Sequence, residues 1–134
     1  MRRAGLLTLL ALAGCRSEPP PAGSGAREAA YRYFDALVRS DWPAAYSALA
    51  AESRKRVSGD GFARLAAAYR RGLAFDPDAA HVTACEEHGD GAIAHVSLTG
   101  KGRHGRRFKE AVTLRREPAG WAVVLPATFG RGGR

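Results

Sequence analysis

One strand-like segment of this chain carries an acid among hydrophobic residues, at Glu110. Phe108, Glu110, Val112 and Leu114 alternate with polar residues between positions 106 and 116, which is the period of a β-strand. Successive side chains of a strand point to opposite faces, so Glu110 shares the inward face of its apolar neighbours. A carboxylate there needs a partner or has a raised pKa, as a general acid or base in a pocket does. The alternative is a residue at the rim of the sheet, paired with an arginine and exposed to water.

Five residues of types that bind metal ions lie close together in the sequence: His81, Cys85, Glu86, Glu87 and His88. On a strand, His81 and Cys85 share a face but lie ~13 Å apart, and His88 points to the other face from Cys85. We therefore expect no metal site and no cofactor. If a two-residue turn follows, Cys85 becomes a small buried hydrophobic residue beside the next strand, among Ala94, Val96 and Leu98.

The N-terminus has the layout of an export signal, with a short cationic start, an apolar run and two small residues before Cys15. A transmembrane anchor needs ~20 apolar residues, and the run between Arg3 and Cys15 is too short. The sequence Leu12-Ala13-Gly14-Cys15 resembles the lipobox of bacterial lipoproteins. That resemblance implies cleavage between Gly14 and Cys15 and a lipid on the Cys15 sulfur. It places the protein in the bacterial cell envelope, on the outer side of the cytoplasmic membrane or in the outer membrane.

Basic residues concentrate between positions 101 and 109. The whole chain has 21 Lys and Arg against 13 Asp and Glu, a net charge of +8, which favours anionic partners. The candidate anion surface comprises Lys101, Arg103, Arg106, Arg107 and Lys109. Nucleic acid is not an expected partner for an exported chain, so anionic lipid headgroups or an acidic envelope polymer are the candidates. The alternative is a solvated loop and strand edge whose charges prevent aggregation.

The chain divides into four parts: a signal peptide at 1–14, the lipidated cysteine and a tether rich in Pro, Gly and Ser at 15–25, a folded domain at 26–127, and a flexible tail at 128–134. The tether contains three consecutive prolines and no apolar pattern. An extended segment of this kind rises ~3 Å per residue, so it spans at most ~30 Å. It would hold the domain near a bilayer without burying it.

Three segments with the apolar period of a helix come first in the domain. The first runs from 26 to 38. The second begins at Asp41, whose carboxylate can accept hydrogen bonds from free backbone N–H groups. The third follows Ser58 or Asp60 and continues to about residue 73.

The period then changes to two, which predicts strands. Residues 81–88 and 92–99 flank Gly89-Asp90-Gly91, a hairpin signal, and residues 106–116 and 121–125 flank the turn at 117–120. We expect Trp121 to anchor the core, on one face with Val123 and Leu125 and against the helical stripe of Phe34, Leu37, Phe62, Leu65 and Tyr69. The elements predict an α+β fold, with three N-terminal helices packed on an antiparallel sheet of about four strands.

Two parts of the sequence are similar to the nuclear transport factor 2-like superfamily. They are Tyr33-Phe34-Asp35-Ala36-Leu37-Val38-Arg39-Ser40-Asp41-Trp42 with the following Ala44-Ala45-Tyr46, and the ending Gly120-Trp121-Ala122-Val123. The order of elements agrees from about residue 26 to 125. The resemblance implies a cone, in which a curved sheet wraps around a long helix and often leaves a pocket at the open end. The candidate pocket residues are Tyr33, Phe34, Tyr69, Glu110 and Trp121.

Some members of that superfamily are enzymes, including ketosteroid isomerase, and Tyr33 matches the tyrosine that polarises a carbonyl there. The isomerase also needs two acids. Arg54-Lys55-Arg56-Val57 stands where the base should follow the second helix, and Val112 stands near the place of the late-strand acid. We therefore expect no catalytic residues.

The sequence thus predicts a membrane-anchored envelope lipoprotein whose domain is a non-catalytic module for binding a small ligand or another protein. The expected partners are the membrane, through the lipid on Cys15, and an apolar small ligand or an envelope protein. A homodimer is compatible with the pattern. Two alternatives stay open, a binder of polyanions or anionic lipid through the basic surface, and a pocket enzyme of the isomerase or dehydratase kind.

Overall fold

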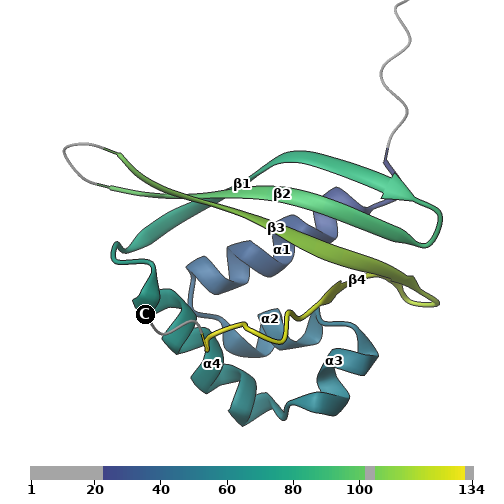
Figure 1. Ribbon diagram of the computed structural model, residues 1–134, viewed down its shortest axis with the longest axis horizontal. Coiled ribbons are helices and arrows are strands. Elements are labelled where there is room, and N and C mark those ends of the chain that lie inside the picture. Colours follow the sequence, from purple (N-terminus) through teal and green to yellow (C-terminus); the bar gives the residue numbers. More distant parts are fainter. Residues whose placement is uncertain (1–22, 102–104, 132–134) are drawn as a thin grey trace, which may run out of the picture.

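The computed structural model describes residues 23–101 and 105–131, in which four helices lie beneath one face of a four-stranded antiparallel sheet (Figure 1). This confirms the predicted α+β class. The predicted signal peptide with Gly14, the lipidation site Cys15 and most of the tether lie outside the described residues, as does Arg103.

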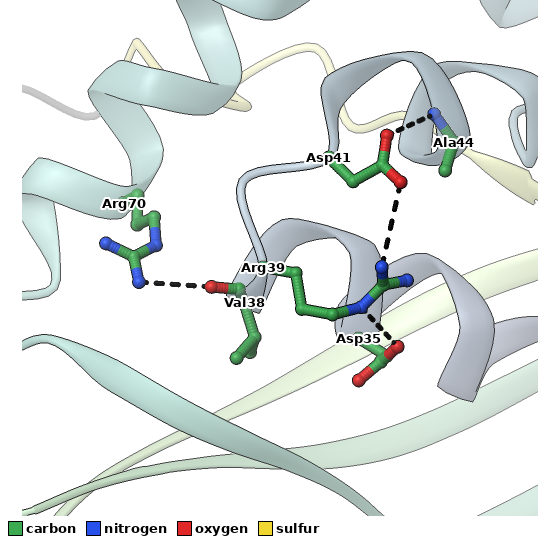
Figure 2. Close-up of polar contacts among 6 residues, drawn as sticks. All are labelled: Asp35, Val38, Arg39, Asp41, Ala44 and Arg70. Carbon is green, nitrogen blue, oxygen red and sulfur yellow. Dashed lines mark hydrogen bonds and ion pairs between the residues drawn. The ribbon is translucent and has the colours of Figure 1, made fainter.

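The first two helices form a corner that is fixed by polar contacts. Helix α1 spans Ala26–Val38 and helix α2 spans Trp42–Ser47. Ser40 turns the chain with a φ of 57°, and the Asp41 carboxylate accepts a hydrogen bond from the Ala44 N–H at 3.2 Å, as predicted (Figure 2). Arg70 reaches over from another helix and donates to the Val38 carbonyl at 3.0 Å, which satisfies a carbonyl at the end of α1.

A short helix that the sequence pattern did not predict, α3, spans Ala51–Arg56. Contacts from the other end of the chain hold it. The Glu117 carboxylate accepts from the Ala51 N–H at 2.8 Å, and the buried Ser53 hydroxyl accepts from the Leu125 N–H at 3.0 Å. The four helices observed, in place of three, follow from these long-range bonds.

The long helix α4 spans Gly59–Gly72, and the Ser58 hydroxyl caps it by accepting from the Gly61 N–H at 3.1 Å. Of the two caps that the sequence offered, Ser58 is therefore the one used. Phe62 and Ala66 are buried on the inner side of the helix, and Leu65 and Tyr69 pack against the core while remaining half-buried.

The sheet has the order β1-β2-β3-β4, with strands Pro77–His88, Gly91–Gly100, Arg106–Glu117 and Gly120–Val124. His88 pairs with Gly91, so the first hairpin has the two-residue turn that was predicted. In the second pairing Val96 lies opposite Glu110 and Ala94 opposite Val112. Val112 and Leu114 are buried while Thr113 and Arg115 are exposed, which confirms the predicted facing of β3.

Strand β4 is covered along its free edge by the segment between α2 and α3. The Val123 N–H donates to the Ala48 carbonyl at 2.9 Å, and the Ala50 N–H donates to the Val123 carbonyl at 2.7 Å. Val123 and Leu125 are buried as predicted. A sheet edge paired in this way offers no free backbone groups at Val123 for association with another strand.

Two expectations about the core are corrected. Trp121 is only half-buried at the rim, because its indole N–H donates to the Ser24 hydroxyl at 2.7 Å where the chain enters the domain. The domain also continues past residue 127, since Phe129 is buried and stacks on Phe62 with ring centroids 5.7 Å apart. Gly130 has a φ of 67° and passes so close to α4 that a Cβ atom would lie 2.3 Å from the Leu65 carbonyl oxygen. The predicted boundary between domain and flexible tail, at residue 128, is therefore too early in the sequence.

Candidate functional site

The structure brings Glu110, Tyr69 and Tyr33 together between β3, α4 and α1; we call these three residues the acid–tyrosine cluster. Strand alternation points Glu110 towards the helices, and the Tyr69 hydroxyl on α4 donates a hydrogen bond to its carboxylate. Tyr33 lies on the buried side of α1 and is close enough for the charge of Glu110 to act on its hydroxyl. The cluster thus joins three elements that are distant in the sequence.

Burial sets the protonation behaviour of the cluster. Removal from water raises the pKa of the Glu110 carboxyl, and the hydrogen bond from Tyr69 opposes that rise without cancelling it. Burial also raises the pKa of Tyr33 and of Tyr69, and the neighbouring Glu110 charge adds to both shifts. Both phenols therefore remain neutral hydrogen-bond donors at physiological pH.

Tyr33 differs from Tyr69 in that its hydroxyl is buried and meets no hydrogen-bond partner among the described residues. Only 2% of the residue is exposed. Buried polar groups are rarely left unpaired in folded proteins, because each one loses its bonds to water without replacement. Among the described residues, the Tyr33 hydroxyl is therefore a buried donor without an acceptor.

Aromatic rings surround the cluster. The Tyr69 ring stacks on Phe129 with ring centroids 4.9 Å apart, and it lies nearly perpendicular to the Phe108 ring with centroids 6.4 Å apart. The Phe34 and Tyr33 rings are also nearly perpendicular, with centroids 5.1 Å apart. Phe108 is 38% exposed, because the N-terminal half of β3, in which it lies, extends beyond the helices. The sequence pattern missed Phe129; an aromatic residue shortly after the last strand was the one signal available.

The predicted pocket residues therefore separate into two places. Tyr33, Phe34, Tyr69 and Glu110 lie around the acid–tyrosine cluster, whereas Trp121 lies at the rim beside Ser24 and under the Arg116 guanidinium, 4.9 Å from the ring centroid. Of the two alternatives for Glu110, pairing with an arginine is wrong, since its hydrogen-bond partner is Tyr69.

The basic residues of the candidate anion surface are exposed where they are described. Lys101, Arg106, Arg107 and Lys109 form no ion pair with any carboxylate in the described part of the chain. They lie at the β2–β3 end of the sheet, opposite the end at which the described chain begins (Figure 1).

Cys85 pairs with Ala94 across the first hairpin, as the two-residue turn required, but its side chain is half-buried and not fully buried. Burial is the largest of the effects that raise the pKa of its thiol, and the Glu87 carboxylate adds to it. Within residues 23–101 and 105–131, no three His, Cys, Asp or Glu side chains gather as metal ligands would. No helix of the same residues has the length and apolar character needed to cross a membrane.

Solved structures with a similar fold include the following two. One is a Campylobacter jejuni protein proposed to be a transpeptidase with a nuclear transport factor 2-like fold; it matches at a TM-score of 0.58 and 14% identity, over 74% of this chain and 96% of that one. The other is a SEC-C motif containing protein from Rhodopseudomonas palustris, at a TM-score of 0.50 and 15% identity, over 69% of each chain. No protein-family model matches the sequence, and no curated protein is similar to it. At these identities the matches establish the shared architecture alone.

Proposed function

Since this chain has a nuclear transport factor 2-like fold, we propose that it is a lipid-anchored, non-catalytic binding protein of the bacterial cell envelope. Its ligand is a mostly apolar small molecule with one polar end. The acid–tyrosine cluster receives that polar end, and the rings of Phe108 and Phe129 contact the apolar body.

The observation that carries this proposal is the buried Tyr33 hydroxyl without a partner in the described residues. A carbonyl or hydroxyl oxygen of a ligand would accept its hydrogen bond and remove the cost of leaving it unpaired. Glu110, with its raised pKa, can either accept a hydrogen bond or donate one when protonated, so the cluster suits a neutral polar group better than a charged one.

The residues at the positions of the two isomerase acids argue against catalysis. Val112, near the place of the second acid in the isomerase pattern, is apolar and buried, and the exposed Arg54, Lys55 and Arg56 occupy the place of the base. The Campylobacter jejuni protein is proposed to be a transpeptidase, so an enzymatic function is the alternative for this chain. Cys85 is a poor nucleophile for such a reaction, because its raised pKa keeps the thiol protonated.

Ligand binding is tested by extracting small molecules from the full chain purified from its native host. We expect one compound to accompany the parent and the control Thr113→Ala, whose side chain lies on the exposed face of the sheet. Glu110→Arg, which fills the cluster with a long charged side chain, should lose that compound. Equal amounts from Glu110→Arg and Thr113→Ala would contradict the proposed site.

The anchor is tested separately through Cys15. The lipobox sequence supports a lipid on this residue, and the described chain begins close to it, with the Ser24 hydroxyl bonded to Glu87 at 2.8 Å. The nine residues from Cys15 to Ser24 reach ~30 Å when extended. Cys15→Ser should move the protein from the membrane to the soluble fraction and abolish labelling by radioactive fatty acid. Unchanged labelling would rule out the anchor.

A second candidate function, binding an acidic envelope polymer, is favoured by the charges of Lys101, Arg106, Arg107 and Lys109, which form no ion pair within residues 23–101 and 105–131. We expect this surface to face away from the bilayer, because it lies at the end of the sheet opposite the start of the described chain (Figure 1). Binding to polyglutamate should weaken steeply with salt and should fall in Arg107→Gln with Lys109→Gln. Preference for anionic vesicles over polyglutamate would favour a lipid partner instead.

A further inference from the structure

A surface hollow of about 420 Å³ lies on a side of α1 that the acid–tyrosine cluster does not reach. Its lining comes from α1, from α2 and α3 with the segment between them, and from the β3–β4 turn with the start of β4. Five small side chains leave this space open: Ala29, Ala44, Ala48, Ala119 and Ala122. A volume of this size is within the range of sites for small molecules, which is about 300–1,000 Å³.

The charged side chains of the hollow are three arginines and two acids, and both acids are already engaged. The Asp35 carboxylate pairs with Arg39 at 2.9 Å, and Arg39 also approaches Asp41 at 3.7 Å (Figure 2). The Glu117 carboxylate accepts the hydrogen bond of the Ala51 N–H at the start of α3. Each of the two acids thus has one carboxylate oxygen engaged by a partner other than Arg32 or Arg54.

The remaining two arginines, Arg32 on α1 and Arg54 on α3, have no carboxylate partner in the part of the chain that the structure describes. Three guanidiniums against two carboxylates leave the hollow with one positive charge. Guanidinium groups bind carboxylates through paired N–H donors, so one monoanionic group matches both the charge and the donors available.

Trp121 forms the aromatic part of the wall. Its indole is held in place by the hydrogen bond to Ser24 and by Arg116, whose guanidinium lies 4.9 Å from the ring centroid. A ring that is fixed before binding gives contact area with little loss of side-chain freedom. Leu49 and the five alanines complete the apolar part of the lining.

We propose that this hollow binds a small organic monoanion, whose carboxylate lies between Arg32 and Arg54 and whose flat apolar body packs against Trp121 and the alanines. This site is separate from the acid–tyrosine cluster and takes a charged ligand, whereas the cluster takes a neutral polar group. The half-buried position of Trp121, beside two arginines without a carboxylate partner among the described residues, fits such a site.

The test titrates naphthalene-2-carboxylate into the full chain and follows the two indole N–H signals by nuclear magnetic resonance. The sequence contains only two tryptophans, and Trp42 does not line the hollow, so its signal is an internal control. We expect the Trp121 signal to shift with saturation while the Trp42 signal stays in place. Arg32→Gln and Arg54→Gln should each weaken binding at least tenfold, which corresponds to about 1.4 kcal/mol, since each removes a charge-assisted hydrogen bond to the carboxylate.

Three controls make the outcome decisive. Arg64→Gln changes an exposed arginine of α4 outside the hollow and should bind like the parent. The neutral analogue 2-(hydroxymethyl)naphthalene should bind at least tenfold more weakly, and inorganic phosphate alone should not shift Trp121. Absence of a Trp121 shift at millimolar probe, equal binding of the neutral analogue, or unchanged binding in both arginine variants would overturn the proposal. Because Glu110→Arg leaves this hollow intact, failure here is distinguishable from failure of the cluster.

Discussion

The hydroxyl of Tyr69 on α4 donates its hydrogen bond to the carboxylate of Glu110 on β3, inside a layer that is otherwise apolar. This contact joins the helical layer to the sheet. Tyr33, the third member of the cluster, has no hydrogen-bond partner among the described residues. The two tyrosine hydroxyls should therefore contribute differently to the free energy of unfolding.

The first prediction concerns pH. Because burial raises the folded-state pKa of Glu110, the folded protein favours the protonated carboxyl more than the unfolded chain does. The stability that this residue contributes is fully present below its unfolded pKa, near 4.5, and is lost as the pH rises through the folded-state pKa.

Glu110→Gln keeps an acceptor for Tyr69 but removes the titration. The free energy of unfolding of the parent, relative to this variant, should therefore fall between pH 4.5 and neutral pH. Urea unfolding at several pH values gives this difference. A constant difference across the range would show that Glu110 titrates as it does in the unfolded chain.

The second prediction compares the two tyrosines. Tyr69→Phe leaves the Glu110 carboxylate without its donor, so it should destabilise the domain by roughly 1–3 kcal/mol. Tyr33→Phe removes a buried hydroxyl that has no partner among the described residues, so it should be neutral or stabilising. Chemical unfolding of both variants decides this, and a larger loss in Tyr33→Phe than in Tyr69→Phe would contradict the arrangement.

The third prediction concerns the end of the chain. Phe129 is 7% exposed and stacks on Phe62 and Tyr69, so Phe129→Ala should cost roughly 3–5 kcal/mol. Thr128→Ala, at an exposed neighbouring position, is the matched control. Equal melting temperatures for the two variants would mean that the domain ends before residue 128.

The fourth prediction concerns Trp121. Because this side chain is half-buried, Trp121→Ala should destabilise the domain less than Leu114→Ala, which empties a fully buried site at a cost of roughly 2–5 kcal/mol. Thermal unfolding of the two variants checks the order. If Trp121→Ala is the more damaging substitution, the indole belongs to the core.

Local patterns predicted those features that depend on neighbouring residues. Asp41 and Ser58 cap their helices because each side chain reaches a backbone N–H three residues later. Alternation along β3 placed Glu110 on the inner face, and Gly89-Asp90 fixed the register of the first hairpin.

The remaining features depend on contacts between distant residues. Helix α3 is held by Glu117 and by the Leu125 N–H, more than sixty residues away. Trp121 lies at the rim because Ser24, ninety-seven residues earlier, accepts its hydrogen bond. The periodicity of apolar residues does not identify such distant partners. It therefore predicted which face Glu110 occupies but not that Tyr69 would be its partner.

The most direct test of the proposed binding function is the intact mass of the full chain, purified from its native host and measured under non-denaturing conditions. Our account predicts a population heavier than the lipidated polypeptide by one discrete small-molecule mass, which disappears on denaturation and is reduced in Glu110→Arg. A parent chain that carries only the mass of the lipidated polypeptide would contradict it.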